Sequence, residues 1–196
     1  MKIGVLALQG AFIEHQKMLE QLGVEVVQVR LPEQLADLDG LIIPGGESTT
    51  IGKLATQFNL IEPLRKFACE KPVWGTCAGM IFLAKNIGRD QPILNVMDIE
   101  VDRNAFGRQI DSFETLLNVA GMDEPFHAIF IRAPVVTSVN ENAGVQILAK
   151  LDDGRIVAVR QGKWLATAFH PELTGDSRFH ALFLKILEEE KALLGK

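Results

Sequence analysis

The stretch PVWGTCAGMIFLAKN, from Pro72 to Asn86, decides the fold of this chain. Residues 72–76 predict a buried strand, and residues 78–86 predict an apolar helix that the strand enters directly. A strand that runs straight into a helix is typical of α/β proteins, in which helices connect parallel strands. The stretch therefore predicts one βα step of a doubly wound sheet.

Strands and helices alternate in the same way from the N-terminus to this stretch. Apolar runs predict strands buried on both faces over residues 3–8, 24–29 and 40–43. Amphipathic segments predict helices over residues 11–22, 32–38, 49–58 and 61–69. In the first of these helices the apolar positions are Phe12, Ile13, Met18, Leu19 and Leu22, and Gly23 stands at the expected C-terminal cap.

After about residue 93 the pattern changes to strands with short connections. Strands are expected over residues 95–102, 113–119, 126–131, 135–139, 145–151, 155–161 and 164–169, and a closing helix over 177–194. Asp152-Asp153-Gly154 between two of these strands is a strong hairpin signal. We therefore predict a single α/β domain over residues 1–196, whose mixed sheet has a parallel core and an antiparallel extension.

Composition narrows the classes of function. The 20 basic residues against 25 acidic ones give a net charge of −5, and the basic residues are scattered, which argues against nucleic-acid binding. The longest uncharged stretch is too short for a membrane span, and the N-terminal run lacks the cleavage site of a secretion signal, so we expect a cytoplasmic protein without a membrane segment. Cys69 and Cys77 form neither a disulfide framework nor a zinc spacing, and no metal site is expected.

Gly75-Thr76-Cys77-Ala78-Gly79 fits the pattern G-x-C-x-G at the strand-to-helix turn. Such a sharp turn strains the backbone of its central residue and leaves no room for side chains at the two glycine positions. The thiol then lies at the edge of the sheet, where the N-terminus of the following helix favours a thiolate. We therefore predict that Cys77 is a nucleophile; the alternative is a small buried cysteine between two glycines.

A thiolate nucleophile needs a base, and the chain has four histidines. His170 follows the expected strand of residues 164–169 and precedes Pro171 and Glu172. In an extended segment, which Pro171 favours over a helix, His170 and Glu172 lie on the same side, so the carboxylate can orient the ring. The result is a predicted triad of Cys77, His170 and Glu172. Taken alone, a His-Pro-Glu string is more often a turn with solvated charges.

Gly45-Gly46-Glu47-Ser48 follows the strand of residues 40–43, so the turn is expected at the same edge of the sheet as the elbow. Its free N–H groups, with the N–H of Ala78, are suited to an oxyanion hole, for which Gly46 and Ala78 are the candidates. Alternatively, Ser48 caps the next helix, and both interpretations can hold. A phosphate-binding glycine pattern is lacking.

The remaining candidates are expected to be structural. Cys69 lies near a helix end without a base, and His15, His127 and His180 lie in regular elements where packing or surface exposure is the ordinary role.

The elbow, the His-Pro-Glu string and the Gly-Gly turn together resemble the class I, or triad, glutamine amidotransferases. Within that family, further strings are similar to those of the glutaminase subunits of pyridoxal 5′-phosphate synthase. These strings are LQG (8–10), PGGESTT (44–50), GTCAG (75–79), RNAFGRQ (103–109), FIRAP (130–134) and FHPELT (169–174). The strings at 103–109 and 130–134 point to this subfamily specifically.

The resemblance implies a three-layer α/β/α, flavodoxin-like fold and a glutaminase reaction. Cys77 would attack the side-chain amide of L-glutamine, with His170 as base and then acid, and with Glu172 orienting His170. The family pattern also implies that a set of six residues holds the glutamine, and these are Gly46, Glu47, Ser48, Arg103, Ile131 and Arg132. No cofactor is implied.

The resemblance further implies a partner. Family members pass ammonia through a tunnel to a (β/α)₈-barrel synthase subunit in a hetero-oligomeric complex, and docking reorders the turn at Gly45-Gly46 and so activates the glutaminase. Gating of this kind prevents the loss of free ammonia.

Two alternatives stay open on sequence alone. One is the glutaminase subunit of another amidotransferase, for example that of histidine biosynthesis, which would share the triad. The other is a non-catalytic, flavodoxin-like binding protein that keeps the elbow cysteine, against which His170 and Glu172 argue.

Overall fold

The computed structural model describes residues 1–106 and 112–195. The helices in this part of the chain are α1 (Phe12–Gln21), α2 (Ser48–Gln57), α3 (Ile61–Glu70), α4 (Ala78–Leu83) and α5 (Arg178–Leu194), with short 3₁₀ turns η1 (Pro32–Leu35), η2 (Glu141–Ala143) and η3 (Pro171–Leu173). The strands are β1 (Lys2–Leu6), β2 (Glu25–Val29), β3 (Gly40–Ile43), β4 (Val73–Thr76), β5 (Ala84–Asn86), β6 (Met97–Asp102), β7 (Ser112–Leu117), β8 (Phe126–Ile131), β9 (Val135–Val139), β10 (Val145–Lys150), β11 (Ile156–Gln161) and β12 (Trp164–Thr167).

Most of these strands form one mixed sheet, in the order β2-β1-β3-β4-β12-β11-β9-β6-β5, with β10 beside β11. The five strands from β2 to β12 are mutually parallel, whereas β11 and β9 run antiparallel to their neighbours. The predicted parallel core with an antiparallel extension is therefore confirmed. So is the hairpin at Asp152-Asp153-Gly154, which joins β10 to β11.

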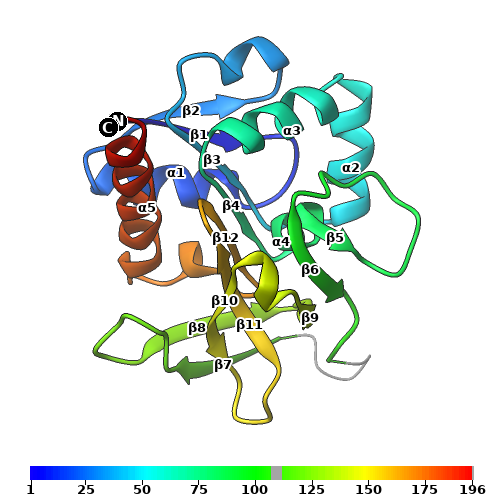
Figure 1. The fold of residues 1–196 in the computed structure, drawn as a ribbon, viewed down its shortest axis with the longest axis vertical. Helices are drawn as coiled ribbons and strands as arrows, with labels where there is room; N and C mark the ends of the chain where they lie inside the picture. Colours follow the sequence, from blue (N-terminus) through cyan, green and yellow to red (C-terminus); the bar gives the residue numbers. More distant parts are fainter. Residues whose placement is uncertain (107–111, 196) are drawn as a thin grey trace.

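Helices cover both faces of the parallel strands, which gives the expected three-layer α/β/α arrangement. Helices α1 and α5 lie together on one face, and α2 and α3 lie on the other (Figure 1). Strands β3 and β4 are buried at every position, as strands covered on both faces must be. No helix in residues 1–106 and 112–195 combines the length and the apolar character that a membrane span needs.

Strands β7 and β8 form a separate antiparallel hairpin beside the main sheet (Figure 1). Aromatic side chains of β8 pack against the rest of the domain. The ring centroid of Phe126 lies 4.8 Å from that of Phe179, and the ring centroid of Phe130 lies 5.5 Å from that of Phe169. A backbone hydrogen bond from His170 N to Ile129 O, 2.8 Å long, adds to this attachment. The end of β8 is thereby held next to the segment that carries His170.

Several predicted elements end differently in the structure. The helix expected over residues 78–86 stops at Leu83, and residues 84–86 form β5, which pairs in parallel with β6. The helix expected over residues 32–38 is the single 3₁₀ turn η1. The predicted cap Gly23 is confirmed, since it adopts a φ of +75° just beyond α1. Residues 107–109 of the RNAFGRQ string lie outside the described residues.

Candidate active site

The elbow at Cys77 has the strained geometry that the glycine pattern predicts. Cys77 adopts φ +49° and ψ −106° between β4 and α4, and its N–H donates to Thr167 O at 2.8 Å. A Cβ at Gly75 would lie 2.4 Å from the backbone of Gly79, and a Cβ at Gly79 would lie 2.0 Å from Ile43 O. Both glycines are therefore required by close backbone contacts, and the turn aims the thiol out of the sheet.

His170 and Glu172 meet as predicted, but not through an extended segment. Residues 171–173 form the 3₁₀ turn η3, in which Pro171 occupies the first position, where it loses no hydrogen bond. Within this turn His170 Nδ1 lies 2.6 Å from Glu172 Oε1, and both side chains are buried. The local geometry in the prediction was wrong, and the pairing was right because both conformations bring these two side chains together.

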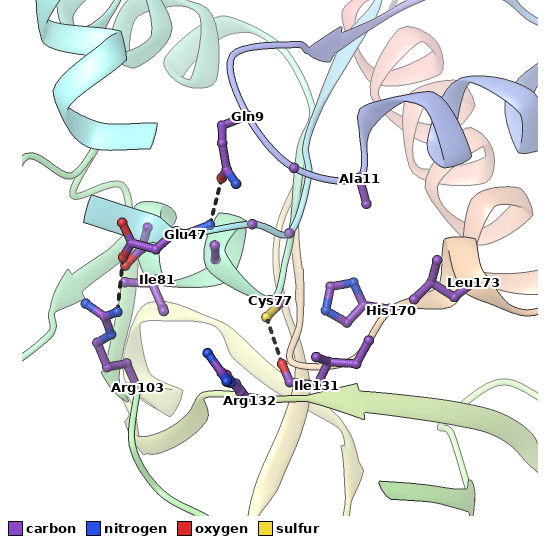
Figure 2. Close-up of a pocket in the computed structure, with 15 residues that line it drawn as sticks. Gln9, Ala11, Glu47, Cys77, Ile81, Arg103, Ile131, Arg132, His170 and Leu173 are labelled. Carbon is purple, nitrogen blue, oxygen red and sulfur yellow. Dashed lines mark hydrogen bonds and ion pairs between the residues drawn. The ribbon is translucent and has the colours of Figure 1, made fainter. Parts of the chain in front are cut away.

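The charge state of the pair follows from its surroundings. Burial alone would lower the pKa of His170, but hydrogen bonds to Cys77 and Glu172, together with the charges of these groups, raise the pKa to about 10. Burial alone would raise the pKa of Glu172, but His15 and His170 outweigh it and keep the pKa below its usual value. At neutral pH the site therefore holds an imidazolium next to a carboxylate, with Cys77 Sγ beside the ring (Figure 2).

The turn at Gly45-Gly46 packs directly against the cysteine and the histidine. A Cβ at Gly45 would lie 2.4 Å from His170 Cε1 and 3.2 Å from Cys77 Cβ. The Gly45 N–H donates to Thr76 Oγ1 at 3.0 Å, and its carbonyl accepts from the N–H of Ala11 at 3.0 Å. Within the described residues, the N–H groups of Gly46 and Ala78 donate no hydrogen bond.

Helix α2 is capped by Glu47 rather than by Ser48, so that part of the prediction was wrong. The Glu47 carboxylate accepts from the N–H groups of Thr49 at 3.0 Å and Thr50 at 2.8 Å, and it pairs with Arg103 Nη2 at 3.1 Å. Burial would raise the pKa of Glu47, but the hydrogen bonds from Thr50 and Thr49 outweigh it and lower the pKa to about 2. Each carboxylate oxygen accepts one of these N–H groups, Oε1 that of Thr49 and Oε2 that of Thr50, so Glu47 satisfies two donors of the first turn.

Ser48 is consequently available for another role. Its side chain is buried, and Oγ has no hydrogen-bond partner among the described residues. A buried hydroxyl without a partner is rare in folded proteins and marks a place where a ligand or water is expected.

A cleft of about 440 Å³ joins these groups into one site (Figure 2). All six residues expected to hold glutamine line it, as do Cys77, Ala78 and His170, whereas Glu172 lies behind His170. Three separate parts of the chain, the start of α2, the end of β6 and the end of β8, contribute Glu47, Arg103 and Arg132 to its walls. The six residues that the family motifs imply therefore lie together at one cleft, although they come from segments far apart in the sequence.

Gln9 and His15 are among the residues of the site that were not predicted. Gln9 lines the cleft, and its Oε1 accepts from Glu47 N at 2.7 Å. His15 is completely buried, with Nε2 3.4 Å from Glu172 Oε2. The signal for His15 was present in the sequence, since Phe12, His15 and Leu19 share one helical stripe, whereas Ile13, expected to face the core, is exposed.

Other candidates have structural positions. Cys69 is exposed on α3, and His127 is exposed on β8, where it pairs with Glu114 at 2.7 Å. In residues 1–106 and 112–195, groups of His, Cys, Asp and Glu suited to hold a metal ion are absent.

Comparisons with known proteins agree with this site. The SNO glutamine amidotransferase family matches residues 5–189. The chain is 65% identical over 190 residues to a pyridoxal 5′-phosphate synthase subunit PdxT from Herpetosiphon aurantiacus, covering 94% of this chain and 99% of the relative. It is 59% identical over 188 residues to the PdxT subunit from Pelotomaculum thermopropionicum, covering 94% of each.

Solved structures give the same result. A crystal structure of a glutamine amidotransferase, 52% identical, superposes with a TM-score of 0.89 over 95% of this chain and 98% of that one. The structure of PurLQS from Thermotoga maritima has a TM-score of 0.67 at 17% identity, over 100% of this chain and 98% of that one, and so shares the fold.

Proposed function

The chain belongs to the SNO glutamine amidotransferase family, and we propose that it is the glutaminase subunit of a pyridoxal 5′-phosphate synthase. It hydrolyses L-glutamine to L-glutamate and ammonia for vitamin B6 biosynthesis. Relatives at 65% and 59% identity over nearly their whole length support this assignment.

In the proposed mechanism Cys77 and His170 act as an ion pair. The Cys77 thiolate attacks the side-chain amide carbon, and the N–H groups of Gly46 and Ala78 stabilise the resulting oxyanion. His170 gives its proton to the leaving nitrogen, the C–N bond breaks, and a γ-glutamyl thioester remains on Cys77. His170 then takes a proton from water, which attacks the thioester and releases glutamate. Glu172 holds the imidazole in the required orientation throughout.

Glutamine is held by groups that the cleft already presents. The guanidinium groups of Arg103 and Arg132 suit the α-carboxylate, and the Glu47 carboxylate suits the α-ammonium group. The unpartnered hydroxyl of Ser48 supplies a further hydrogen bond. Ile131 and the Gly46 backbone complete the cleft and place the amide carbon next to Cys77.

The proposed partner is a synthase subunit with a (β/α)₈ barrel, which receives the ammonia in a hetero-oligomeric complex in the cytoplasm. Residues 1–196 act as one glutaminase domain, without a cofactor of their own. Docking of the synthase rearranges the turn at Gly45-Gly46, which intramolecular hydrogen bonds hold at both N–H and C=O of Gly45. Hydrolysis is thereby coupled to the presence of an acceptor for ammonia.

The observation that carries the proposal is the buried contact between His170 and Glu172 at the wall of a cleft that also contains Cys77. The test is glutamate release from L-glutamine by the chain with and without a pyridoxal 5′-phosphate synthase barrel subunit. Cys77→Ala is the inactive variant, and Cys69→Ser, at the exposed cysteine, is the matched control.

We expect release only with the synthase, unchanged in Cys69→Ser and absent in Cys77→Ala, which still docks. Equal activity without the synthase would favour another amidotransferase pathway, and inactivity with a competent synthase would favour a non-catalytic binding protein.

A further inference from the structure

We propose that His15, fixed by His180, is a positioning residue that donates a hydrogen bond to the second carboxylate oxygen of Glu172. This bond keeps the first carboxylate oxygen directed at the His170 ring. The inference rests on the proposed glutaminase function. It extends the site by two buried histidines that do not touch the cleft.

Glu172 needs such a donor. Its Oε1 is occupied by His170 at 2.6 Å, whereas its Oε2 is buried and makes no hydrogen bond of good geometry within the described residues. His15 Nε2 lies 3.4 Å from this oxygen. A small rotation of either side chain therefore gives the carboxylate its second N–H, and a buried carboxylate is strongly stabilised by such a bond.

The proton arrangement follows from the partners of His15. Its Nδ1 lies 2.9 Å from His180 Nε2, and its Nε2 lies 3.2 Å from Thr76 Oγ1. If His180 carries its proton on Nε2, it donates to His15 Nδ1, and His15 then carries its own proton on Nε2, within reach of both Thr76 Oγ1 and Glu172 Oε2. The opposite tautomers would turn a ring lone pair of His15 toward the carboxylate, which is repulsive. His180 thereby selects the tautomer of His15 that serves Glu172.

Both histidines are neutral in this arrangement. Burial lowers the pKa of His15. Burial and the neighbouring His15 lower the pKa of His180 to about 2. The charged or titratable groups that act on His15 are Glu172, His170 and His180, with Glu14 on its own helix. A neutral donor at this position supports the carboxylate without adding a positive charge that would compete with the His170 imidazolium.

The pair is held rigidly between two helices and the sheet. Helices α1 and α5, which carry His15 and His180, pack side by side (Figure 1). The indole of Trp74 on β4 meets both rings edge-on, with centroids 5.5 Å from His15 and 4.9 Å from His180.

Thr76 extends the network to the oxyanion turn. Its hydroxyl contacts His15 Nε2 and accepts the N–H of Gly45. His15 is therefore connected on one side to the triad carboxylate and on the other to the backbone that the proposed activation rearranges.

The test compares His15→Phe, which keeps an aromatic ring against Trp74 but has no donor, with His15→Gln, whose amide places an N–H near the position of Nε2. His127→Gln, at an exposed histidine that pairs with a carboxylate, is the matched control. Each is assayed for glutamate release in complex with the synthase subunit, with separate kcat and KM, and for thermal unfolding.

We expect His15→Phe to lower kcat about tenfold or more with KM changed less than about twofold, in line with removal of outer hydrogen-bond partners at other sites. His15→Gln should recover most of kcat, and His127→Gln should match the unmutated chain. Unchanged kcat in His15→Phe, or equal losses in His15→Phe and His15→Gln, would overturn the inference.

A measurement on the unmutated protein covers the case in which a variant does not fold. ¹⁵N NMR of the four imidazoles reports which ring nitrogen carries the proton. His15 protonated on Nε2 and bare on Nδ1 supports the inference, and the reverse overturns it. This result is independent of the proposed function, which fails instead if the unmutated complex releases no glutamate.

Discussion

Replacing Glu172 by glutamine tests the triad at the one member that does not line the cleft. The change keeps the size of the side chain but removes the charge that faces His170 Nδ1 at 2.6 Å. The pKa of His170 is about 10 instead of 6.5, a gap that corresponds to about 5 kcal/mol at ~1.36 kcal/mol per pH unit. Cys77 and Glu172 together raise this pKa against the opposing effect of burial, so loss of the carboxylate should cost the imidazolium ~2–3 kcal/mol, which is roughly 30- to 150-fold in the ratio of imidazolium to imidazole.

Loss of the correct tautomer adds to this effect, because the new amide can offer its NH₂ to the ring instead of an oxygen. We therefore expect kcat to fall between about 10² and 10⁴-fold, the upper value being that of the corresponding change in a serine-protease triad. KM should stay within about twofold, since Glu172 does not line the cleft.

The assay is glutamate release at saturating glutamine in complex with the synthase. The matched control is Glu114→Gln, which removes the carboxylate of an exposed pair with His127 and should leave kcat unchanged. A Glu172→Gln complex that retained more than about a third of kcat would refute the role of Glu172 as orienter.

Three further substitutions probe the turn, the cap and the cleft. Gly10→Ala places a Cβ 1.8 Å from Gly45 O at a φ of +102°, so it should displace the oxyanion turn and lower glutamate release at least about tenfold. The control is Gly144→Ala, which also has a positive φ, +81°, but has open space around the new Cβ. It should cost only backbone strain of about 1 kcal/mol and remain active. Glu47→Ala should lower the unfolding free energy by about 1 kcal/mol through loss of the cap. The pKa of Glu47 is about 2 in the folded chain, below its ordinary 4.5, so the difference in unfolding free energy between the unmutated chain and Glu47→Ala should be fully present above pH 4.5 and vanish as the pH falls toward 2. Chemical denaturation at a series of pH values measures it, and a difference that stays constant with pH would contradict the role of the Glu47 charge. Arg103→Met should raise KM for glutamine about tenfold or more while kcat changes less, and an unchanged KM would remove Arg103 from the glutamine site.

The parallel half of the fold could be predicted from sequence because strands buried on both faces leave an unmistakable apolar run. Strand β3 was predicted to the residue, and the elbow followed from the two glycines that backbone contacts require. The end of α4 could not be predicted. Residues 84–86, Ala-Lys-Asn, contain no glycine or proline that would end a helix, and only their pairing with β6, a contact that is not local in sequence, turns them into a strand.

The site was predictable where its chemistry depends on residue type and less so where it depends on packing. Cys77 and His170 are reactive types in special local contexts, so the sequence shows them directly. Ser48 is a common cap, and only the structure shows that the Glu47 side chain takes that position and leaves the Ser48 hydroxyl unpartnered. His15 was assigned to ordinary packing because its partner His180 is 165 residues away in sequence.

The central claim is that Cys77 forms the covalent bond to the substrate. The most direct measurement uses a glutamine analogue with a chloromethyl ketone in place of the side-chain amide, followed by peptide mass analysis of the complex with the synthase. We predict inactivation in step with a single label on the peptide that contains Cys77, and protection by glutamine. Inactivation with the label on Cys69 or another residue, or glutamate release that persists in Cys77→Ala, would contradict the account.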